Sequence, residues 1–244
     1  MNKLFDLTGK VAVITGASGF LGRYFVEGLK LSGATVLGLD INPPADILDI
    51  TDEKAINEWV NKTVKKYQHI DVLVNNAANQ STNFTSMENF PLSEWEQEIK
   101  VNLTGTFLMS RAVGLQMVKQ NQGSIINLAS IHVLQAPDFS VYESTKIKGS
   151  PLVYTVTKAG IIGMTKYLAS YWGKYQVRVN ALIPGGVENN QDKNFIQNYS
   201  KKVPLKRMAK PEDLIGAIIF LASDASTYIT GLNLVVDGGL TSKA

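Results

Sequence analysis

The sequence predicts a single α/β domain over residues 1–244, built on a doubly wound parallel sheet flanked by helices. Short continuous apolar segments alternate with amphipathic helical segments along the whole chain. Such apolar segments are typical of strands buried on both faces, and their alternation with helices indicates parallel strands joined by crossovers. No linker, internal repeat or low-complexity segment divides the chain, so its length is expected to form one domain.

The first strand, helix and second strand surround a glycine-rich loop. Residues 10–15 form a continuous apolar segment, Gly16-Ala-Ser-Gly-Phe-Leu-Gly22 follows, and a helical pattern leads to a second apolar segment at 34–39. Glycine permits a tight turn and close approach of a pyrophosphate, while the helix N-terminus offers free N–H groups to its charge. A simple turn is the alternative, but this context favours a Rossmann-type dinucleotide site.

Asp40, directly after the second strand, indicates which dinucleotide is bound. A carboxylate at this position accepts hydrogen bonds from the adenosine ribose and repels a 2′-phosphate. No Arg or Lys lies between Val36 and Ile50. The expected cofactor is therefore NAD, and NADP is less favoured.

The strand and helix pattern continues to the C-terminus. Further strands are predicted at 46–50, 70–74, 123–128, 176–183 and 233–236. Helices are predicted at 56–67 (with Thr51 as the candidate cap), 92–120, 154–172 and 211–221. Residues 79–91 are expected to be a loop, and residues 188–210 a polar, irregular lid over the crevice.

Ser130 and a Tyr-x-x-x-Lys pair suggest proton-transfer chemistry. Tyr154 and Lys158 are four residues apart, so on a helix they share a face. A nearby ammonium is expected to lower the pKa of the phenol, and the Ser130 hydroxyl can hold the reacting oxygen. A second pair, Tyr142 and Lys146, precedes Gly149 and Pro151, which break a helix. We therefore assign the chemistry to Tyr154 and Lys158, and place Tyr142 in a loop or the substrate wall.

Composition excludes several other functions. The net charge is +3 and there are no cysteines and only two histidines, so neither disulfides, thiol catalysis nor a metal site is expected. No apolar segment is long enough to span a membrane and no signal pattern is present, which favours a cytoplasmic location. One basic cluster is either a solvated surface or a region that attracts an anionic substrate, and nucleic-acid binding is not expected. Its members are Lys201, Lys202, Lys206, Arg207 and Lys210.

Together with the terminal Val236-Asp237-Gly238-Gly239, these motifs resemble the compact single-domain branch of the short-chain dehydrogenase/reductase family. The likeness implies a catalytic tetrad of Asn102, Ser130, Tyr154 and Lys158, in which Asn102 holds a relay water; on the residues alone, Asn102 is a surface asparagine. The implied cofactor-binding residues are Gly16, Ser18, Gly19, Phe20, Leu21, Gly22, Asp40, Asp49, Ile50, Asn75, Ala77, Tyr154, Lys158, Pro184, Gly185 and Val187. A homotetramer or homodimer joined through the helices at 92–120 and 154–172 is also implied.

Three features depart from the family pattern. Phe20 replaces the middle glycine of the loop, and Asn189 stands where a threonine is usual. Tyr154 follows Ser130 by 24 residues, about twice the family spacing, which defines an insertion at 137–151. The insertion more weakly resembles reductases of flagellin or surface-glycan sugar modification. It is either a plain surface loop or a binding segment for a polyhydroxylated substrate, through Asp138, Tyr142, Glu143, Ser144 and Thr145.

The expected function is NAD(P)-dependent interconversion of a secondary alcohol and a ketone on a small-molecule substrate, with Tyr154 as general acid or base. Two alternatives remain open. One is a non-enzymatic dinucleotide sensor or scaffold, which needs Asp40 and the glycines but not Ser130 or Tyr154. The other is a sugar-nucleotide epimerase, which only the position of Gly19 favours.

Overall fold

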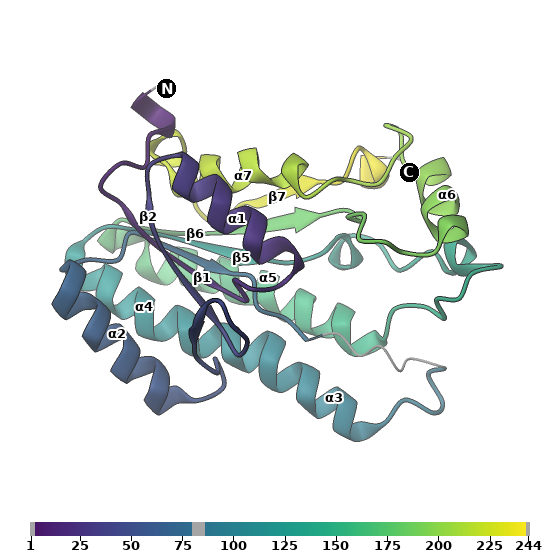
Figure 1. Cartoon of the computed structure of the whole chain (residues 1–244), viewed down its shortest axis with the longest axis horizontal. Helices are drawn as coiled ribbons and strands as arrows, with labels where there is room; N and C mark the ends of the chain where they lie inside the picture. The colour runs from purple at the N-terminus through teal and green to yellow at the C-terminus, as the bar shows by residue number, and fades with distance from the viewer. Residues whose placement is uncertain (1–2, 80–85, 243–244) are drawn as a thin grey trace.

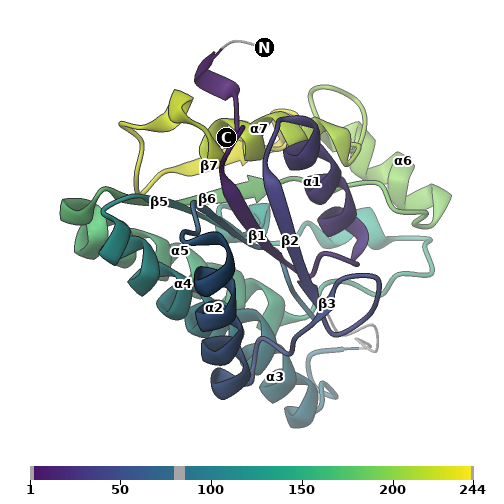
Figure 2. The same ribbon diagram turned by 60° about the vertical axis from the view of Figure 1, so that its left-hand side comes forward.

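A computed structural model describes residues 3–79 and 86–242, which form one seven-stranded parallel sheet (Figure 2). The strand order is β3-β2-β1-β4-β5-β6-β7, so the chain reverses direction across the sheet between β1 and β4. A ligand crevice forms at the carboxyl ends of the strands at such a reversal. The strands are β1 (Val11–Thr15), β2 (Thr35–Asp40), β3 (Asp46–Ile47), β4 (Val72–Asn75), β5 (Gly123–Leu128), β6 (Val177–Pro184) and β7 (Asn233–Val236).

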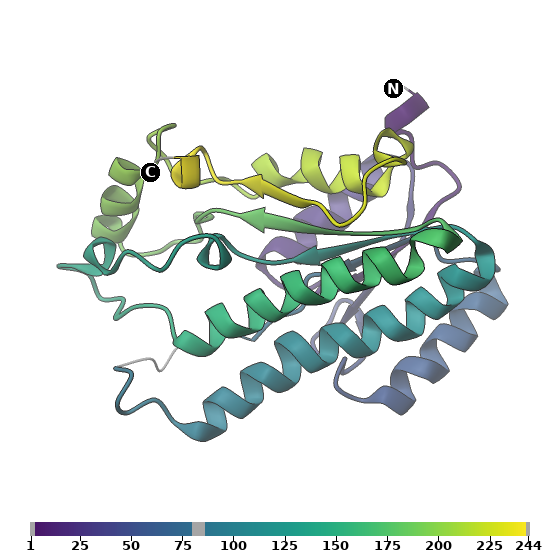
Figure 3. The ribbon, with the colours of Figure 1, turned by 180° about the vertical axis from the view of Figure 1, so that it is seen from behind.

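Helices cover both faces of the sheet, as Figure 1 shows. Helices α1 (Phe20–Leu31) and α7 (Glu212–Ala222) lie on one face. Helices α2 (Glu53–Tyr67), α4 (Thr106–Gln120) and α5 (Leu152–Trp172) lie on the other, where α4 and α5 run side by side (Figure 3). Each layer has its own apolar core against the sheet, one around Phe25 and Leu214 and one around Met109 and Trp172.

Burial of the strands follows their position in the sheet. All residues of β1, β4 and β5 are buried, as the continuous apolar segments predict. The prediction of a fully buried β2 is wrong, because only Leu39 of this strand is buried. Strand β3 pairs only with Leu39 and Asp40, which leaves the rest of β2 at the sheet edge.

The helix predicted over residues 92–120 is divided into three parts. Helix α3 (Leu92–Glu98) leads into a π-helical segment (Ile99–Gly105), which continues as α4. The π-helical segment holds Asn102, which is 1% exposed. The surface position that residue type alone favours for Asn102 is therefore wrong. The wider π-helical turn holds this buried polar side chain, and π-bulges in helices often lie at functional sites.

The segment 188–210 is not irregular throughout. Helix α6 (Lys193–Lys202) occupies its centre, and the Asp192 carboxylate caps this helix by accepting hydrogen bonds from the amides of Asn194 and Phe195. A parallel bridge between Val187 and Ala209 closes the base of the segment. The sequence did not predict helix α6, because most of its residues are polar and only a narrow apolar side contacts the rest of the protein.

Smaller differences concern the ends of elements. Asp52, not Thr51, caps α2 by accepting a hydrogen bond from the Ala55 amide. Strands β5 and β7 have the predicted bounds. Among the described residues, no helix is long and apolar enough to cross a membrane. Short 3-10 turns lie at Lys3–Phe5, Ile131–Val133, Phe139–Tyr142, Gly173–Tyr175, Asp224–Ser226 and Leu240–Ser242.

Candidate active site

The glycine loop after β1 is folded tightly against its neighbours. Gly16 has φ +67°, and a Cβ there would lie 2.7 Å from Cα of Ala77. A Cβ on Gly22 would lie 2.0 Å from the carbonyl oxygen of Gly16. Helix α1 begins after Gly19, and no side chain caps its N-terminus. The loop thus offers close backbone approach and uncapped amides, which suit a pyrophosphate.

Hydrogen bonds of the Asn76 side chain connect this loop to the end of β4. Its Nδ2 donates hydrogen bonds to the carbonyl oxygens of Thr15 and Gly16, at 3.0 Å each. The Thr15 hydroxyl in turn accepts from the amides of Asn76 and Ala77. Sequence reasoning gave Asn76 no role of its own, although its position directly after a buried strand was a usable signal.

Asn75 was expected to line the cofactor, but its side chain turns into the protein. The Nδ2 atom donates to Ser110 Oγ and Asn127 Oδ1, both at 2.8 Å. Asn127 donates onward to the Thr165 hydroxyl. This buried network links β4 and β5 to α4 and α5, so the side chain of Asn75 does not line the crevice.

Asp40 lies beside the glycine loop, as the sequence predicts for the ribose-binding acid. Its carboxylate accepts hydrogen bonds from the amides of Ser18 and Asn42, at 3.0 Å each. These contacts fix the side chain and leave further lone pairs on both oxygens. Asp49 is exposed and accepts from the Thr51 amide, whereas Ile50 is buried against Gly105 of the π-helical segment.

Ser130, Tyr154 and Lys158 come together at the end of β5. Lys158, 4% exposed, donates a 2.7 Å hydrogen bond from Nζ to the carbonyl oxygen of Leu128. The same nitrogen lies 5.6 Å from the centre of the Tyr154 ring. Ser130 is buried two residues beyond Leu128, and its side chain acts to lower the pKa of Tyr154. The geometry therefore favours Tyr154 over Tyr142 as the tyrosine of the Ser-Tyr-Lys group.

The pKa values of the two ionisable groups are displaced in opposite directions. Burial lowers the pKa of Lys158 to about 8, and the carboxylate of Glu98 opposes this shift. Burial raises the pKa of Tyr154, against the hydrogen bond from Ser130, and Glu98 raises it further. The expected lowering of the phenol pKa by Lys158 is therefore wrong for the protein alone, because desolvation of the phenolate is the larger effect.

Asn102 is connected to the chain that follows β4. Its Oδ1 accepts from the Asn79 amide and its Nδ2 donates to the Asn79 carbonyl oxygen, both at 2.7 Å. The Thr106 hydroxyl donates to the Asn102 carbonyl oxygen. Both groups of the side-chain amide are thus used in holding residue 79, at the edge of the described segment.

The rival pair, Tyr142 and Lys146, lies apart from this group. Tyr142 ends a 3-10 turn, where burial raises its pKa, and its ring packs 5.4 Å from the ring of Phe195. Lys146 is exposed and lies outside any helix. The two side chains therefore do not share a helical face, as the glycine and proline that follow them predict.

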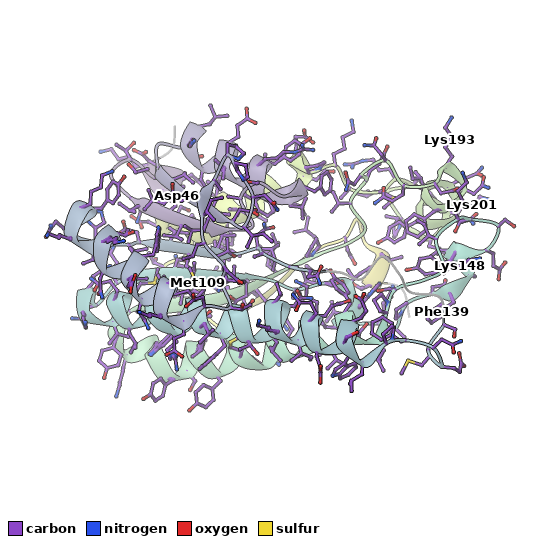
Figure 4. The ribbon with its side chains drawn as sticks, turned by 60° about the horizontal axis from the view of Figure 1, so that its bottom comes forward. Asp46, Met109, Phe139, Lys148, Lys193 and Lys201 are labelled. Atoms are coloured by element: carbon purple, nitrogen blue, oxygen red, sulfur yellow. The ribbon has the colours of Figure 1, made fainter. Side chains whose placement is uncertain are left out.

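A cavity of about 710 Å³ opens between Tyr154, the insertion at 137–151 and helix α6. Figure 4 shows Phe139 and Lys148 of the insertion at the same end of the molecule as Lys193 and Lys201 of α6. Predicted site residues that line the cavity are Phe20, Leu21, Ser130, Asp138, Tyr142, Tyr154, Pro184, Gly185, Val187 and Asn189. Sequence reasoning missed His132 and Gln135 among its walls, although the position of His132 two residues after Ser130 was a usable signal. Ser150 belongs to the insertion, and Gln191, Tyr199 and Lys202 belong to the segment 188–210 that was expected to cover the crevice.

Comparisons with known proteins agree with this architecture. Residues 40–241 match the family model described as Enoyl-(Acyl carrier protein) reductase. The chain is 35% identical to a 3-oxoacyl-(acyl-carrier-protein) reductase of Thermotoga maritima, over 96% of this chain and 98% of the relative. It is 33% identical to an NAD-dependent glycerol dehydrogenase of Listeria innocua, over 99% and 98% of the two chains.

A solved short-chain dehydrogenase of Leptospira borgpetersenii with bound NAD+ superposes with a TM-score of 0.91. It is 38% identical and covers 99% of this chain and 96% of its own. These sequence matches and the shared fold extend over nearly the full length of the chain. The chain belongs to the short-chain dehydrogenase/reductase family.

Proposed function

We propose that this NAD(P)-dependent oxidoreductase of secondary alcohols and ketones prefers NAD and acts on a small polyhydroxylated substrate. The observation that carries the proposal is the position of Ser130 and Tyr154 in the wall of one cavity, above the buried ammonium of Lys158. A sensor needs no such group, and the cavity offers the space for a small alcohol.

Asp40 supports the preference for NAD. Its half-buried carboxylate is fixed by two amides beside the glycine loop, where it would accept hydrogen bonds from ribose hydroxyls. A 2′-phosphate at the same place would meet a like charge. The Listeria relative is named NAD-dependent and the Leptospira structure contains NAD+, whereas the structure of a gluconate 5-dehydrogenase from Burkholderia cenocepacia contains NADP, so the preference rests on Asp40.

The catalytic roles are proposed from the resemblance to the family and from the position of each side chain. A bound nicotinamide would donate or accept the hydride. Ser130 would hold the substrate oxygen, and the Tyr154 hydroxyl would give it a proton during reduction or take one during oxidation. The ammonium of Lys158 would stabilise the phenolate and bind the nicotinamide ribose. Asn102 would hold a water that passes protons between Lys158 and solvent. Pro184, Gly185 and Val187 would line the nicotinamide side of the cavity.

The insertion and the segment 188–210 are proposed to cover the substrate together. Asn194 donates to the Ser144 carbonyl oxygen at 2.9 Å, and Asn198 donates to the Glu143 carbonyl oxygen at 3.2 Å. The insertion therefore contacts α6, and other residues of both segments line the cavity. A substrate that enters here is enclosed by both segments.

A homodimer or homotetramer is proposed from the outer surface of α4 and α5. Large apolar side chains are exposed there: Phe107, Leu115, Tyr167 and Tyr171, with Tyr167 67% exposed. The rings of Tyr167 and Tyr171 stack at 5.9 Å. Exposed apolar side chains grouped on adjoining helices are typical of an interface, and a second copy of this chain would cover them.

The proposed function is tested by absorbance of NADH during incubation with NAD or NADP and a panel of polyols, sugars and simple secondary alcohols. Wild-type protein is expected to form NADH, and Tyr154→Phe to lower kcat/KM by about 10²- to 10⁴-fold while cofactor binding is retained. Tyr142→Phe is the matched control on the rival tyrosine. An inactive Tyr142→Phe beside an active Tyr154→Phe would contradict the assignment, and cofactor binding without turnover of any compound would favour a sensor.

A further inference from the structure

The walls of the cavity carry only one pair of opposite formal charges. Among its lining residues that the structure describes, Asp138 and Lys202 alone are charged, and they form an ion pair at 3.0 Å. Their side chains are 46% and 49% exposed, which places the pair at the mouth of the cavity. An anionic substrate would therefore meet a cation that a carboxylate already neutralises.

The interior of the cavity is polar but neutral close to the reacting group. The His132 ring packs edge-on against the Tyr154 ring, with 6.0 Å between the centres. Burial lowers the pKa of His132, so the ring is neutral at pH 7. A neutral imidazole carries one donor and one acceptor, a combination that suits a hydroxyl group.

Two of these neutral groups have unused hydrogen-bonding capacity. Ser150 lines the cavity and is 6% exposed, and its Oγ has no hydrogen-bond partner within residues 3–79 and 86–242. The Nδ1 atom of His132 likewise lacks a partner in the described part of the chain. Both atoms are themselves buried, so a ligand would reach them after a χ1 rotation of Ser150 and a turn of the His132 ring. Buried polar groups are nearly always hydrogen-bonded in folded proteins, so unpartnered groups on side chains of a cavity wall indicate positions that a ligand completes.

Both residues also border the inserted segment. His132 follows Ser130 by two residues, and Ser150 precedes Tyr154 by four residues, so the insertion leaves and rejoins the catalytic group between them. The insertion also contacts α6 through the ion pair between Asp138 and Lys202. The insertion therefore has a defined position relative to the reacting hydroxyl of a substrate.

We propose that His132 and Ser150 are specificity-determining residues that bind a second hydroxyl group of an uncharged polyol or sugar, next to the carbinol that Tyr154 deprotonates. This inference rests on the proposed function, because it concerns the substrate of the same site. It adds that the substrate is uncharged and that a neighbouring hydroxyl contributes to its recognition. The reaction remains the NAD-coupled oxidation of one carbinol to a ketone, with its proton passed to Tyr154.

Two matched substrate pairs test the proposal with wild-type protein and NAD. D-sorbitol and D-gluconate differ in the carboxylate, and 2,3-butanediol and 2-butanol differ in the second hydroxyl. The expected kcat/KM is at least about tenfold higher for sorbitol than for gluconate. It is also at least about tenfold higher for 2,3-butanediol than for 2-butanol, as the loss of one hydrogen bond would give. A gluconate value equal to or above that of sorbitol would overturn the proposal.

Variants then separate binding of the second hydroxyl from a structural role. His132→Phe keeps an aromatic ring beside Tyr154, and Ser150→Ala removes only the hydroxyl. Each is expected to lower the ratio of kcat/KM for 2,3-butanediol to that for 2-butanol about fivefold to tenfold. His132→Gln, which keeps a donor and an acceptor, is expected to restore part of the ratio.

Lys148→Ala is the control, because Lys148 is an exposed residue of the insertion outside the cavity walls. It is expected to keep the ratio of the wild-type protein. Equal losses for both substrates in the His132 and Ser150 variants would overturn the proposal in favour of a packing role. Absence of NADH formation with every compound would contradict the proposed function itself, and the inference with it.

Discussion

The ammonium nitrogen of Lys158 donates a 2.7 Å hydrogen bond to the carbonyl oxygen of Leu128. Leu128 is the last residue of β5, and Ser130 follows it on the same main chain. One strand end therefore positions the serine directly and the lysine through a hydrogen bond. Tyr154, one helical turn before Lys158 on α5, is fixed against both.

Exchanging Gly22 for alanine tests whether close packing of the glycine loop is required. A Cβ at Gly22 would lie 2.0 Å from the Gly16 carbonyl oxygen, so Gly22→Ala must displace the loop from α1. We expect cofactor affinity to fall at least about tenfold and stability by about 1–3 kcal/mol. Titration of NADH fluorescence and chemical unfolding measure the two effects.

The matched control for this exchange is Gly216→Ala. Gly216 lies inside α7, and a Cβ there would meet nothing within 4 Å among the described residues. This variant should keep its cofactor affinity and gain up to about 1 kcal/mol of stability from helix propensity. Equal NADH affinities for the Gly22 and Gly216 variants would show that the loop tolerates the added methyl group.

Removing the charge of Asp40 should shift the cofactor preference. Asp40→Asn keeps the shape of the side chain but replaces a carboxylate that accepts from two amides and is proposed to bind the ribose. Since hydrogen bonds to charged groups contribute about 1.5–3 kcal/mol, kcat/KM for NAD should fall roughly 10- to 100-fold. The value for NADP should rise, because the repulsion of the 2′-phosphate is gone.

Asp46→Asn is the control for Asp40, since Asp46 is an exposed aspartate on the adjoining strand β3. Kinetics with NAD and NADP should be unchanged in this variant. A wild-type enzyme that already prefers NADP, or an Asp40 variant with an unaltered ratio, would contradict the proposed role of the carboxylate.

The sequence predicts those features of the molecule that depend on residues close together in the chain. Strands β5 and β7 have their predicted bounds because continuous apolar segments end at turn residues. The buried position of Asn102 in the π-helical segment was not predictable, because its side chain is satisfied by the main chain of Asn79, 23 residues earlier. A sequence pattern records the unfavourable asparagine but not the partner that makes it favourable.

The same distinction applies to the site. Gly16, Asp40, Ser130, Tyr154 and Lys158 could be found because their spacing follows from one strand end or one helical turn. The remaining walls of the cavity could not be identified residue by residue, because they form where the insertion meets α6 in three dimensions. The direction of the Tyr154 pKa was also missed, since burial depends on the packing of the whole protein and not on the lysine four residues away.

Glu98 should affect the pH dependence of kcat/KM for alcohol oxidation through the pKa values of Tyr154 and Lys158. Its carboxylate is fully buried and raises the pKa of both groups. Glu98→Gln removes the negative charge, so the pKa of Tyr154 falls and the phenolate forms at lower pH. Alcohol oxidation requires the phenolate, and the rise of kcat/KM with pH should therefore move to lower pH.

The control for Glu98 is Glu96→Gln, an exposed glutamate on the same helix. Its pH profile of kcat/KM should match that of the wild-type protein. His132, the other titratable group that packs on Tyr154, is neutral at pH 7 and above, because burial lowers its pKa. A Glu98→Gln profile that changes in height but not in position would indicate a purely structural role for Glu98.

Lys158 should make the stability of the protein increase with pH in the alkaline range. Its pKa is about 8 in the folded protein against 10.5 for the ordinary side chain, so between these values the unfolded state binds more protons. The free energy of unfolding of the wild-type protein, relative to Lys158→Met, should therefore rise by about 2 kcal/mol between pH 7.5 and 9.5. Urea unfolding at both pH values measures this difference, and other groups that titrate alike in the two proteins cancel. A difference that is constant or falls with pH would show that the buried amine keeps its proton throughout this range, held there by the Leu128 carbonyl and Glu98.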